Sequence, residues 1–180
     1  IFAAGYDTFA MRSEDKTLSV FELDLPEMVN DKRARIERAG LLYRAVSIPC
    51  DLSEDTWPEK LLSGGYRSGE TAFCSMLGIS YYLSEPDFRA LLRAAAQITT
   101  TGSVLCLDYP AEQSRRADVN RALAQDAGEA MKARYTPRAM EALLHESGWL
   151  IREHLSASEM TGRFFSAHNQ NTSEHPMAAP

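Results

Sequence analysis

The sequence predicts an α/β fold of the Rossmann-like class, in which helices cover both faces of an open, mostly parallel sheet. Strand-like segments alternate with helix-like segments along most of the chain, and this alternation is typical of a parallel sheet. Two of the strand-like segments, residues 71–77 and 103–109, are nearly continuous apolar runs, as expected of strands buried on both faces. Since a chain of 180 residues suits one domain of about 100–200 residues, we expect residues 1–180 to form a single domain.

The first half of the chain begins with strand-like residues. Ile1 ends the first predicted strand, and the β-branched and aromatic residues of segment 17–25 predict the second. Residues 26–39 are expected to form a helix, because a proline fits its first turn and Gly40 fits the position after its end. Residues 43–49 are the third predicted strand.

The alternation continues in the middle of the chain. The apolar runs 71–77 and 103–109 are the fourth and fifth predicted strands. Between them, Ser84 has the spacing of a capping box with Asp87 and is expected to begin a helix. This helix carries one apolar stripe at helical spacing. The stripe consists of Phe88, Leu91, Leu92 and Ala95.

The C-terminal part is less regular. Residues 113–134 are polar and rich in alanine, and they are expected to form an exposed helix, a lid or a substrate-contacting segment. A Thr-Pro pair at 136–137 begins another predicted helix, which Gly148 ends. Residues 149–155 are the final predicted strand, and residues 169–180, which have no periodicity, are expected to form a loop.

Composition and charge exclude several classes of protein. With 44% apolar and 24% charged residues the chain is typical of folded globular proteins, and no apolar run approaches the ~20 residues of a membrane span. The net charge of −6 argues against a nucleic-acid partner, and the basic residues between positions 32 and 38 are expected on a solvated helix face.

The cysteines Cys50, Cys74 and Cys106 lie in apolar segments. We expect reduced core thiols, a cytoplasmic location and no membrane partner.

Small or acidic residues follow three consecutive predicted strands. They are Ala3, Ala4 and Gly5 after the first, Glu22 and Asp24 at the end of the second, and Asp51 with Leu52 after the third. In open parallel sheets, ligands bind at the carboxyl ends of the strands, where the strand order reverses. These residues are therefore the candidates for a ligand site.

The chemistry of these strand ends indicates an adenosine-containing cofactor. Small residues in the first turn let the backbone approach a ligand closely, and an acid after the second strand can accept both ribose hydroxyls. Asp51 suits the amino group of adenine, and Leu52 suits its ring. The chain has no G-x-G-x-x-G fingerprint, which disfavours a dinucleotide. S-adenosyl-L-methionine, which has adenosine but no pyrophosphate, fits best.

Four stretches, FAAGYDTFAMR, FELDLPEMVNDKRAR, PCDL and LGISYYLSEPDFRALL, resemble the class I S-adenosylmethionine-dependent methyltransferases of the leucine carboxyl methyltransferase type. The likeness is greatest to their bacterial branch, described as O-methyltransferases linked to polyketide biosynthesis. It covers essentially the whole chain and implies the class I methyltransferase fold, S-adenosyl-L-methionine as cofactor and a small-molecule methyl acceptor. Such relatives carry a lid-forming segment before the first turn and a last strand after the stretch matching residues 174–180. We therefore expect this chain to be the core of a longer protein, without these two parts.

The resemblance also implies which residues bind. The cofactor-binding positions fall on Ala3, Ala4, Gly5, Glu22, Asp24, Asp51, Leu52, Leu77 and Gly78. Arg12 matches an arginine that follows the D-T turn, and Tyr81 and Tyr82 are candidates for contact with the acceptor or the sulfonium, since aromatic faces attract cations.

Two positions depart from the pattern. Ala3 replaces the first glycine of the turn, and Leu77-Gly78 replaces a Glu that eukaryotic members keep, so the resemblance does not extend to a protein C-terminal leucine as substrate.

The sequence assigns no catalytic residue. Methyl transfer to oxygen is an in-line displacement in which positioning supplies much of the rate. A carboxylate acceptor needs no general base, whereas a hydroxyl acceptor does. Asp108, His145 and His154 are the candidates for such a base, but none has a triad-like partner in the sequence. The histidines and cysteines lack metal-ligand spacing, so no metal is expected.

Two other functions stay open at this point. A catalytically degenerate protein with the methyltransferase fold, which binds a partner or ligand, is favoured by Ala3 and by the absent Glu at the fourth strand end. An NAD-dependent oxidoreductase is disfavoured by the absent glycine fingerprint. The identity of the acceptor and the oligomeric state are not indicated by the sequence.

Overall fold

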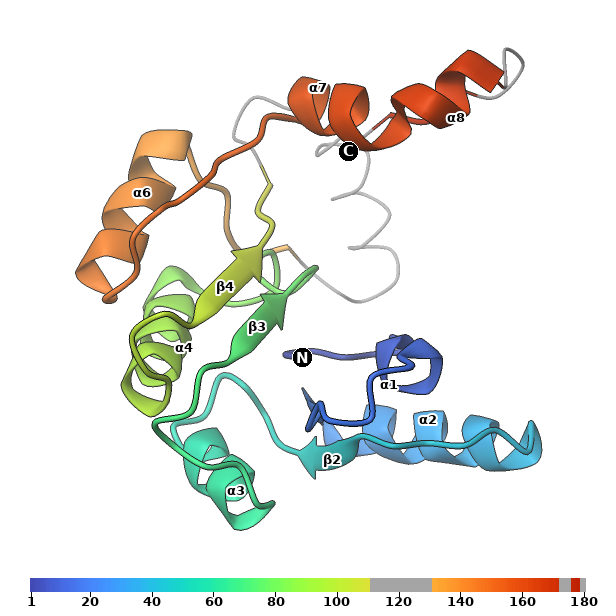
Figure 1. Ribbon diagram of the computed structural model, residues 1–180. Coiled ribbons are helices and arrows are strands. Elements are labelled where there is room, and N and C mark those ends of the chain that lie inside the picture. The colour runs from blue at the N-terminus through green and yellow to red at the C-terminus, as the bar shows by residue number, and fades with distance from the viewer. Residues whose placement is uncertain (111–130, 172–175, 179–180) are drawn as a thin grey trace.

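The computed structural model describes residues 1–110, 131–171 and 176–178. Its strands form two parallel pairs (Figure 1). In the first pair, β1 (Phe21–Asp24) lies beside β2 (Val46–Pro49), with Leu23 opposite Ile48. In the second pair, β3 (Phe73–Met76) lies beside β4 (Val104–Leu107).

The first four residues join the two pairs into one sheet. The Phe2 amide donates to the Ser75 carbonyl at 2.8 Å on the β3 side. On the β1 side, Phe2 forms a parallel bridge with Leu23, whose amide donates to the Ile1 carbonyl at 2.9 Å. The spatial order is therefore β2, β1, residues 1–4, β3 and β4. The chain order reverses at residues 1–4, which makes the residues that follow them the topological switch point of the sheet.

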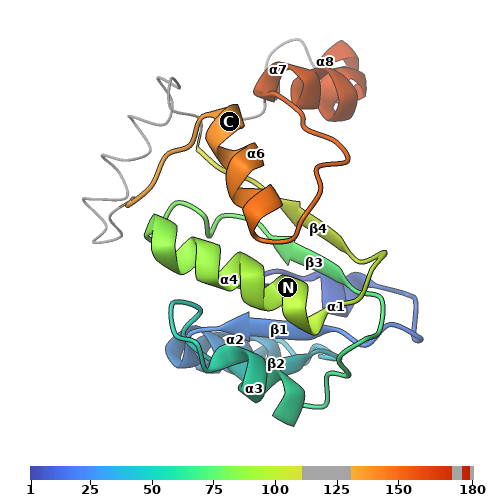
Figure 2. The same ribbon diagram turned by 90° about the vertical axis from the view of Figure 1, so that its left-hand side faces the viewer.

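Helices alternate with these strands and lie on both faces of the sheet. In Figure 2, α3 and α4 lie in front of the sheet, and α1 and α2 lie behind it. The predicted α/β class, with parallel strands between helices, is confirmed. The helices of this part are α1 (Phe9–Arg12), α2 (Pro26–Arg38), α3 (Trp57–Ser63), α4 (Glu85–Ile98) and α6 (Pro137–Glu146). A helical segment without buried residues follows, consisting of α7 (Ala157–Met160), the π-helix η1 (Thr161–Phe165) and α8 (Ser166–Asn171).

The predicted helix starts and the predicted core stripe are confirmed. Ser84 accepts the Asp87 amide at the start of α4, and Thr136 accepts the Ala139 amide at the start of α6. The stripe on α4 is almost completely buried, with exposed fractions of 0–1% for its four members. Its apolar side chains join Leu23, Ile48 and Met76 of the strands in one core cluster. In the same cluster, the rings of Phe2 and Trp57 meet edge to face at 5.3 Å.

Two predictions for the C-terminal part need correction, and a third falls mostly on residues outside those described. Residues 149–155 are not a strand, because no described strand lies beside them to complete a ladder and Leu150 is 84% exposed. Residues 169–171 are the last turn of α8 and not a loop, and the Asn171 amide group donates to the Ala167 carbonyl at 2.9 Å. Most of the segment 113–134 lies outside the described residues, and its residues 131–134 are not helical.

Two side-chain predictions are also wrong. Cys106 is exposed, because the face of β4 that carries it is left uncovered by the described residues, whereas Cys50 and Cys74 are buried free thiols. Lys32, expected on a solvated helix face, is buried on the inner side of α2. It lies there because it pairs with a buried carboxylate of β1.

Candidate functional site

The candidate site lies at the carboxyl-terminal edge of the sheet. The strands are parallel, so the turns that follow residues 1–4, β1, β2, β3 and β4 meet at one edge. These turns contain the predicted cofactor positions.

The first turn has a backbone that glycine favours. Gly5 has φ +45°, and nothing lies within 4 Å of the place where its Cβ would be. Ala3 has φ +49°, the only non-glycine residue with positive φ among the residues described. The Asp7 amide closes the turn by donating to the Ala4 carbonyl at 2.8 Å. The turn therefore presents bare backbone with open space above Gly5.

Asp24 connects this turn to the end of β1. One of its carboxylate oxygens accepts the Gly5 amide at 2.6 Å, and the other accepts the Leu25 amide at 2.8 Å. A carboxylate has about four lone-pair positions, so these two bonds leave Asp24 able to accept further hydrogen bonds. The side chain is partly exposed at the turn, in the position that the sequence predicted for it.

Tyr6 ties the first turn to α2, which sequence reasoning did not predict. Its hydroxyl donates to Asp31, and this hydrogen bond raises the pKa of Tyr6. Arg35 donates to the same carboxylate at 2.7 Å and lies over the Tyr6 ring, 4.9 Å from its centre. The sequence signal for the Asp31–Arg35 ion pair was the i, i+4 spacing of these two residues on the predicted helix.

Glu22 has a different environment from Asp24, although the two lie on one face of β1. It is 3% exposed and accepts hydrogen bonds from the Lys32 ammonium and from the Tyr43 hydroxyl. Burial raises the pKa of Tyr43 to about 12. The second oxygen of Glu22, Oε1, has no partner among the described residues. Glu22 and Asp24 both line a small cavity that Gly5 also lines.

Asp51 and Leu52 separate after β2. Asp51 accepts both the amide and the hydroxyl of Ser53, at 2.8 Å and 2.7 Å, and these bonds lower its pKa. The Cys50 amide donates to the Asp24 carbonyl, which brings Asp51 beside the end of β1. Leu52 is 7% exposed and belongs to the core cluster, so its side chain points inward.

The turn after β3 is organised by Asp108. Leu77 is exposed, and Gly78 has φ +74°. The Asp108 carboxylate accepts the Gly78 amide at 2.7 Å and the Tyr81 hydroxyl at 2.6 Å. Burial, together with the hydrogen bond to Asp108, raises the pKa of Tyr81. The Tyr82 ring lies edge to face with Tyr81, with centroids 6.0 Å apart.

The structure places the candidates for acceptor contact or for a general base, Arg12, His145 and His154, in different parts of the fold. Arg12 is exposed on α1 and donates to the Thr8 hydroxyl at 2.8 Å. His145 lies in the last turn of α6. His154 approaches the end of β4, where its Nε2 lies 2.7 Å from the hydroxyl of Tyr109. This pairing could not be predicted from the sequence, because the two residues are 45 positions apart.

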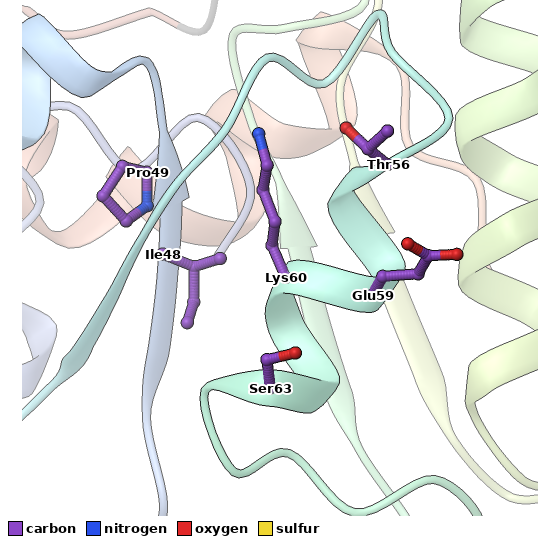
Figure 3. Close-up of a pocket in the computed structure, with 6 residues that line it drawn as sticks. All are labelled: Ile48, Pro49, Thr56, Glu59, Lys60 and Ser63. Atoms are coloured by element: carbon purple, nitrogen blue, oxygen red, sulfur yellow. The ribbon is translucent and has the colours of Figure 1, made fainter.

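A separate cavity of about 400 Å³ lies between β2 and α3, and Figure 3 shows its lining. Lys60, Glu59, Thr56 and Ser63 come from the α3 side, and Ile48 and Pro49 from β2. None of the predicted cofactor residues lines it, so we do not assign it to the site. Within the described part of the chain, no three His, Cys, Asp or Glu side chains gather to hold a metal ion. No described helix is long and apolar enough to cross a membrane.

Solved structures show the same fold. The mitomycin 7-O-methyltransferase MmcR superimposes with a TM-score of 0.63 over 86% of this chain and 43% of its own, at 17% identity. The complex of LepI with S-adenosylmethionine superimposes with a TM-score of 0.58 over 84% of this chain and 37% of its own, at 17% identity. At this identity the likeness concerns the fold, which is the class I methyltransferase fold.

Sequence comparison identifies the family. The profile of the family "Leucine carboxyl methyltransferase" matches residues 1–96. "Putative S-adenosyl-L-methionine-dependent methyltransferase YktD" of Bacillus subtilis (strain 168) is 32% identical over 96% of this chain and 60% of its own length. A relative with the same description from Mycolicibacterium smegmatis is 28% identical over 89% of this chain and 56% of its own length. The chain belongs to the leucine carboxyl methyltransferase family, and it spans about 60% or less of the length of these curated relatives.

Proposed function

We propose that this protein transfers a methyl group from S-adenosyl-L-methionine to an oxygen atom of a small molecule. The observation that carries the proposal is Asp24, whose carboxylate lies against the bare Gly5 turn at the switch point and keeps lone pairs free. The relatives described as S-adenosyl-L-methionine-dependent methyltransferases support the cofactor. The mitomycin 7-O-methyltransferase supports a small acceptor and an oxygen target.

The residues present fit the adenosine part of this cofactor. Open space above Gly5 admits a ligand close to the backbone, and Asp24 beside it can accept two ribose hydroxyls. Asp51 has one carboxylate oxygen that is not bonded to Ser53 and can accept an amino group. When bound, the cofactor supplies a methyl group activated by a sulfonium.

We assign roles to the remaining predicted positions on the same basis. Ala3 and Ala4 shape the turn, and the backbone of Leu77 and Gly78 borders the site on the β3 side. Because Glu22 and Leu52 are buried, we propose that they support the site from beneath. The acceptor side is assigned to Arg12, Tyr81 and Tyr82.

Domain organisation, branch of the family and location are proposed from other features of the chain. We propose that residues 1–180 form one cofactor-binding domain, with the segment 113–134 as a lid or substrate segment. The motif likeness supports the bacterial branch linked to polyketide biosynthesis. The acidic net charge disfavours a nucleic-acid partner, and the three free cysteines favour the cytoplasm.

The first test is calorimetric titration of S-adenosyl-L-methionine, and we expect binding below millimolar concentration. Replacement Asp24→Ala should weaken the affinity at least tenfold, because hydrogen bonds to a charged group contribute about 1.5–3 kcal/mol. The matched control is Asp55→Ala, which removes an exposed carboxylate from the loop before α3 and should leave the affinity unchanged. Absence of binding at millimolar cofactor contradicts the proposal. Unchanged affinity in Asp24→Ala would show that the cofactor binds elsewhere in the protein.

One observation favours a second candidate, a protein that binds the cofactor without catalysis. Ala3 holds a left-handed backbone conformation where the family pattern has glycine, so a methyl group stands in the first turn. Transfer of label from methyl-labelled cofactor to small carboxylates and phenols separates the two candidates. Cofactor binding without transfer to any acceptor supports the second one.

A further inference from the structure

We infer that Asp108 is a positioning residue that fixes the turn between β3 and α4 at the edge of the site, and that it is not the general base. The inference rests on the proposed function, since it concerns the side of the site that we assign to the acceptor. Its basis is the set of hydrogen bonds that connect Asp108, at the end of β4, with the turn 77–82. Sequence reasoning placed Asp108 among the candidates for a base.

Three groups of this turn donate to Asp108. The Gly78 amide and the Tyr81 hydroxyl each bind one carboxylate oxygen, at 2.7 Å and 2.6 Å. The Ser80 hydroxyl, which is completely buried, donates to the Asp108 carbonyl at 2.8 Å. The residue that follows β4 therefore receives a main-chain donor, a phenol and a hydroxyl from the turn after the neighbouring strand β3.

This arrangement restrains the turn at Gly78 and at Tyr81. Gly78 has φ +74°, and nothing lies within 4 Å of the place where its Cβ would be. At Gly78 itself the hydrogen bond to Asp108 is the direct restraint, whereas the next residues, Ile79 and Ser80, are also held by burial, with exposed fractions of 6% and 0%. Tyr81 is fixed through its ring hydroxyl by Asp108 and through its carbonyl by the Lys132 amide at 2.7 Å. The ring of Tyr82 packs against that of Tyr81.

The same contacts argue against Asp108 as a base. Each of its oxygens already accepts a short hydrogen bond, and hydrogen bonds to an ionised acceptor are about twice as strong as neutral ones. Accepting a proton from a substrate would remove the negative charge that strengthens both of these bonds. Tyr81 is oriented to donate toward Asp108, which keeps its hydroxyl proton from serving the acceptor.

Replacement by asparagine distinguishes positioning from proton transfer. In Asp108→Asn, the amide oxygen can still accept the Gly78 amide, and the amide nitrogen can donate to the Tyr81 hydroxyl oxygen. Asparagine cannot act as a general base. Asp108→Ala removes both side-chain bonds, and Tyr81→Phe removes only the bond to the phenol.

The first readout is hydrogen exchange of the Gly78 amide, which needs neither cofactor nor activity. We expect exchange to accelerate tenfold or more in Asp108→Ala and to change less than threefold in Asp108→Asn and in Asp55→Ala. The fold-change follows from the loss of a hydrogen bond to a charged group. An unchanged rate in Asp108→Ala overturns the inference, whether or not the protein proves to be a methyltransferase.

The second readout is methyl transfer as a function of pH. We expect Asp108→Asn to keep kcat and kcat/KM for the acceptor within about threefold and to keep the pH profile. Asp108→Ala should lose tenfold or more in kcat/KM, and Tyr81→Phe should raise KM for the acceptor more than it lowers kcat. If Asp108→Asn loses activity as completely as Asp108→Ala and also loses the acidic limb of the profile, Asp108 is the base and the inference is wrong.

Discussion

Ala3 has a φ of +49°, in the left-handed region of backbone conformation. This conformation costs a residue with a Cβ about 1–2 kcal/mol. The residue is nevertheless placed well, because its methyl group packs against the core cluster. Ala3 therefore combines an unfavourable backbone with favourable burial at the first turn of the candidate site.

We expect Ala3→Gly to raise the free energy of unfolding by about 0.5–1 kcal/mol. Relief of the backbone strain outweighs the greater freedom of glycine in the unfolded chain, which costs about 0.4–1 kcal/mol. Urea titration measures the change. The control is Ala90→Gly on the exposed face of α4, which should lower stability by about 1 kcal/mol. If both variants lose stability alike, the methyl contact of Ala3 outweighs its strain.

At the scale of residues, polar patterns predicted which side chains lie at the strand ends but not the partners that they contact. Asp24 lies where a strand-end acid was expected. Its neighbour Glu22 could not be distinguished from it, because the two share one face of a strand and differ only in burial. That difference depends on Lys32 and Tyr43, and contacts of this kind are not encoded by spacing along a single element.

Among the elements, α2 is held by a buried ion pair. Lys32, in the middle of α2, donates to Glu22 of β1, and the two side chains are 6% and 3% exposed. Tyr43 adds a third group that precedes β2, since its hydroxyl donates to Glu22 and lies 3.0 Å from the Ser47 hydroxyl. The pair therefore joins one helix to the two strands at this end of the sheet.

We expect Lys32→Met to lower the free energy of unfolding by about 3–5 kcal/mol, because it leaves the Glu22 carboxylate buried without a counter-charge. The double variant Glu22→Leu/Lys32→Met should recover most of the loss. Arg33→Met, on the exposed face of α2, is the matched control and should change stability by less than about 0.5 kcal/mol. Denaturant midpoints measure all three. A double variant no more stable than Lys32→Met contradicts this interpretation.

Helices with strong boundary signals could be predicted, and short ones could not. The helices α2, α4 and α6 begin at a proline or a capping hydroxyl and carry an apolar face. By contrast, α3 has seven residues, too few to show a period. Its signals were the Thr-Trp-Pro start at 56–58 and the glycine at 64. The predicted strand at 149–155 failed because an apolar segment becomes a strand only beside another strand.

At the scale of the whole molecule, residues 1–4 are the link that makes the sheet continuous within the described part of the chain. Phe2 contributes a main-chain bond to β3, a bridge to β1 and a ring that packs on Trp57. Both strand pairs share the core cluster that contains these two rings. We therefore expect the two halves of the sheet to unfold together.

The variant Phe2→Ala tests this expectation. It should lower the free energy of unfolding by about 3–5 kcal/mol, the cost of removing a buried aromatic ring. Unfolding followed by tryptophan fluorescence and by far-ultraviolet circular dichroism should give coincident transitions in the unmodified protein. Transitions at different denaturant concentrations would show that the two strand pairs are independent units.

The central position of residues 1–4 also has a consequence for synthesis on the ribosome. Phe2 pairs with Ser75, which lies 73 residues later in the chain. At ~5–20 residues per second, the residue that completes the middle of the sheet is made roughly 4–15 seconds after Phe2. During this interval Phe2 can pair only on the β1 side, and its other edge is open to chaperones or to unwanted association. The central segment of the sheet is thus made before both of its neighbouring strands, and its pairing is completed late.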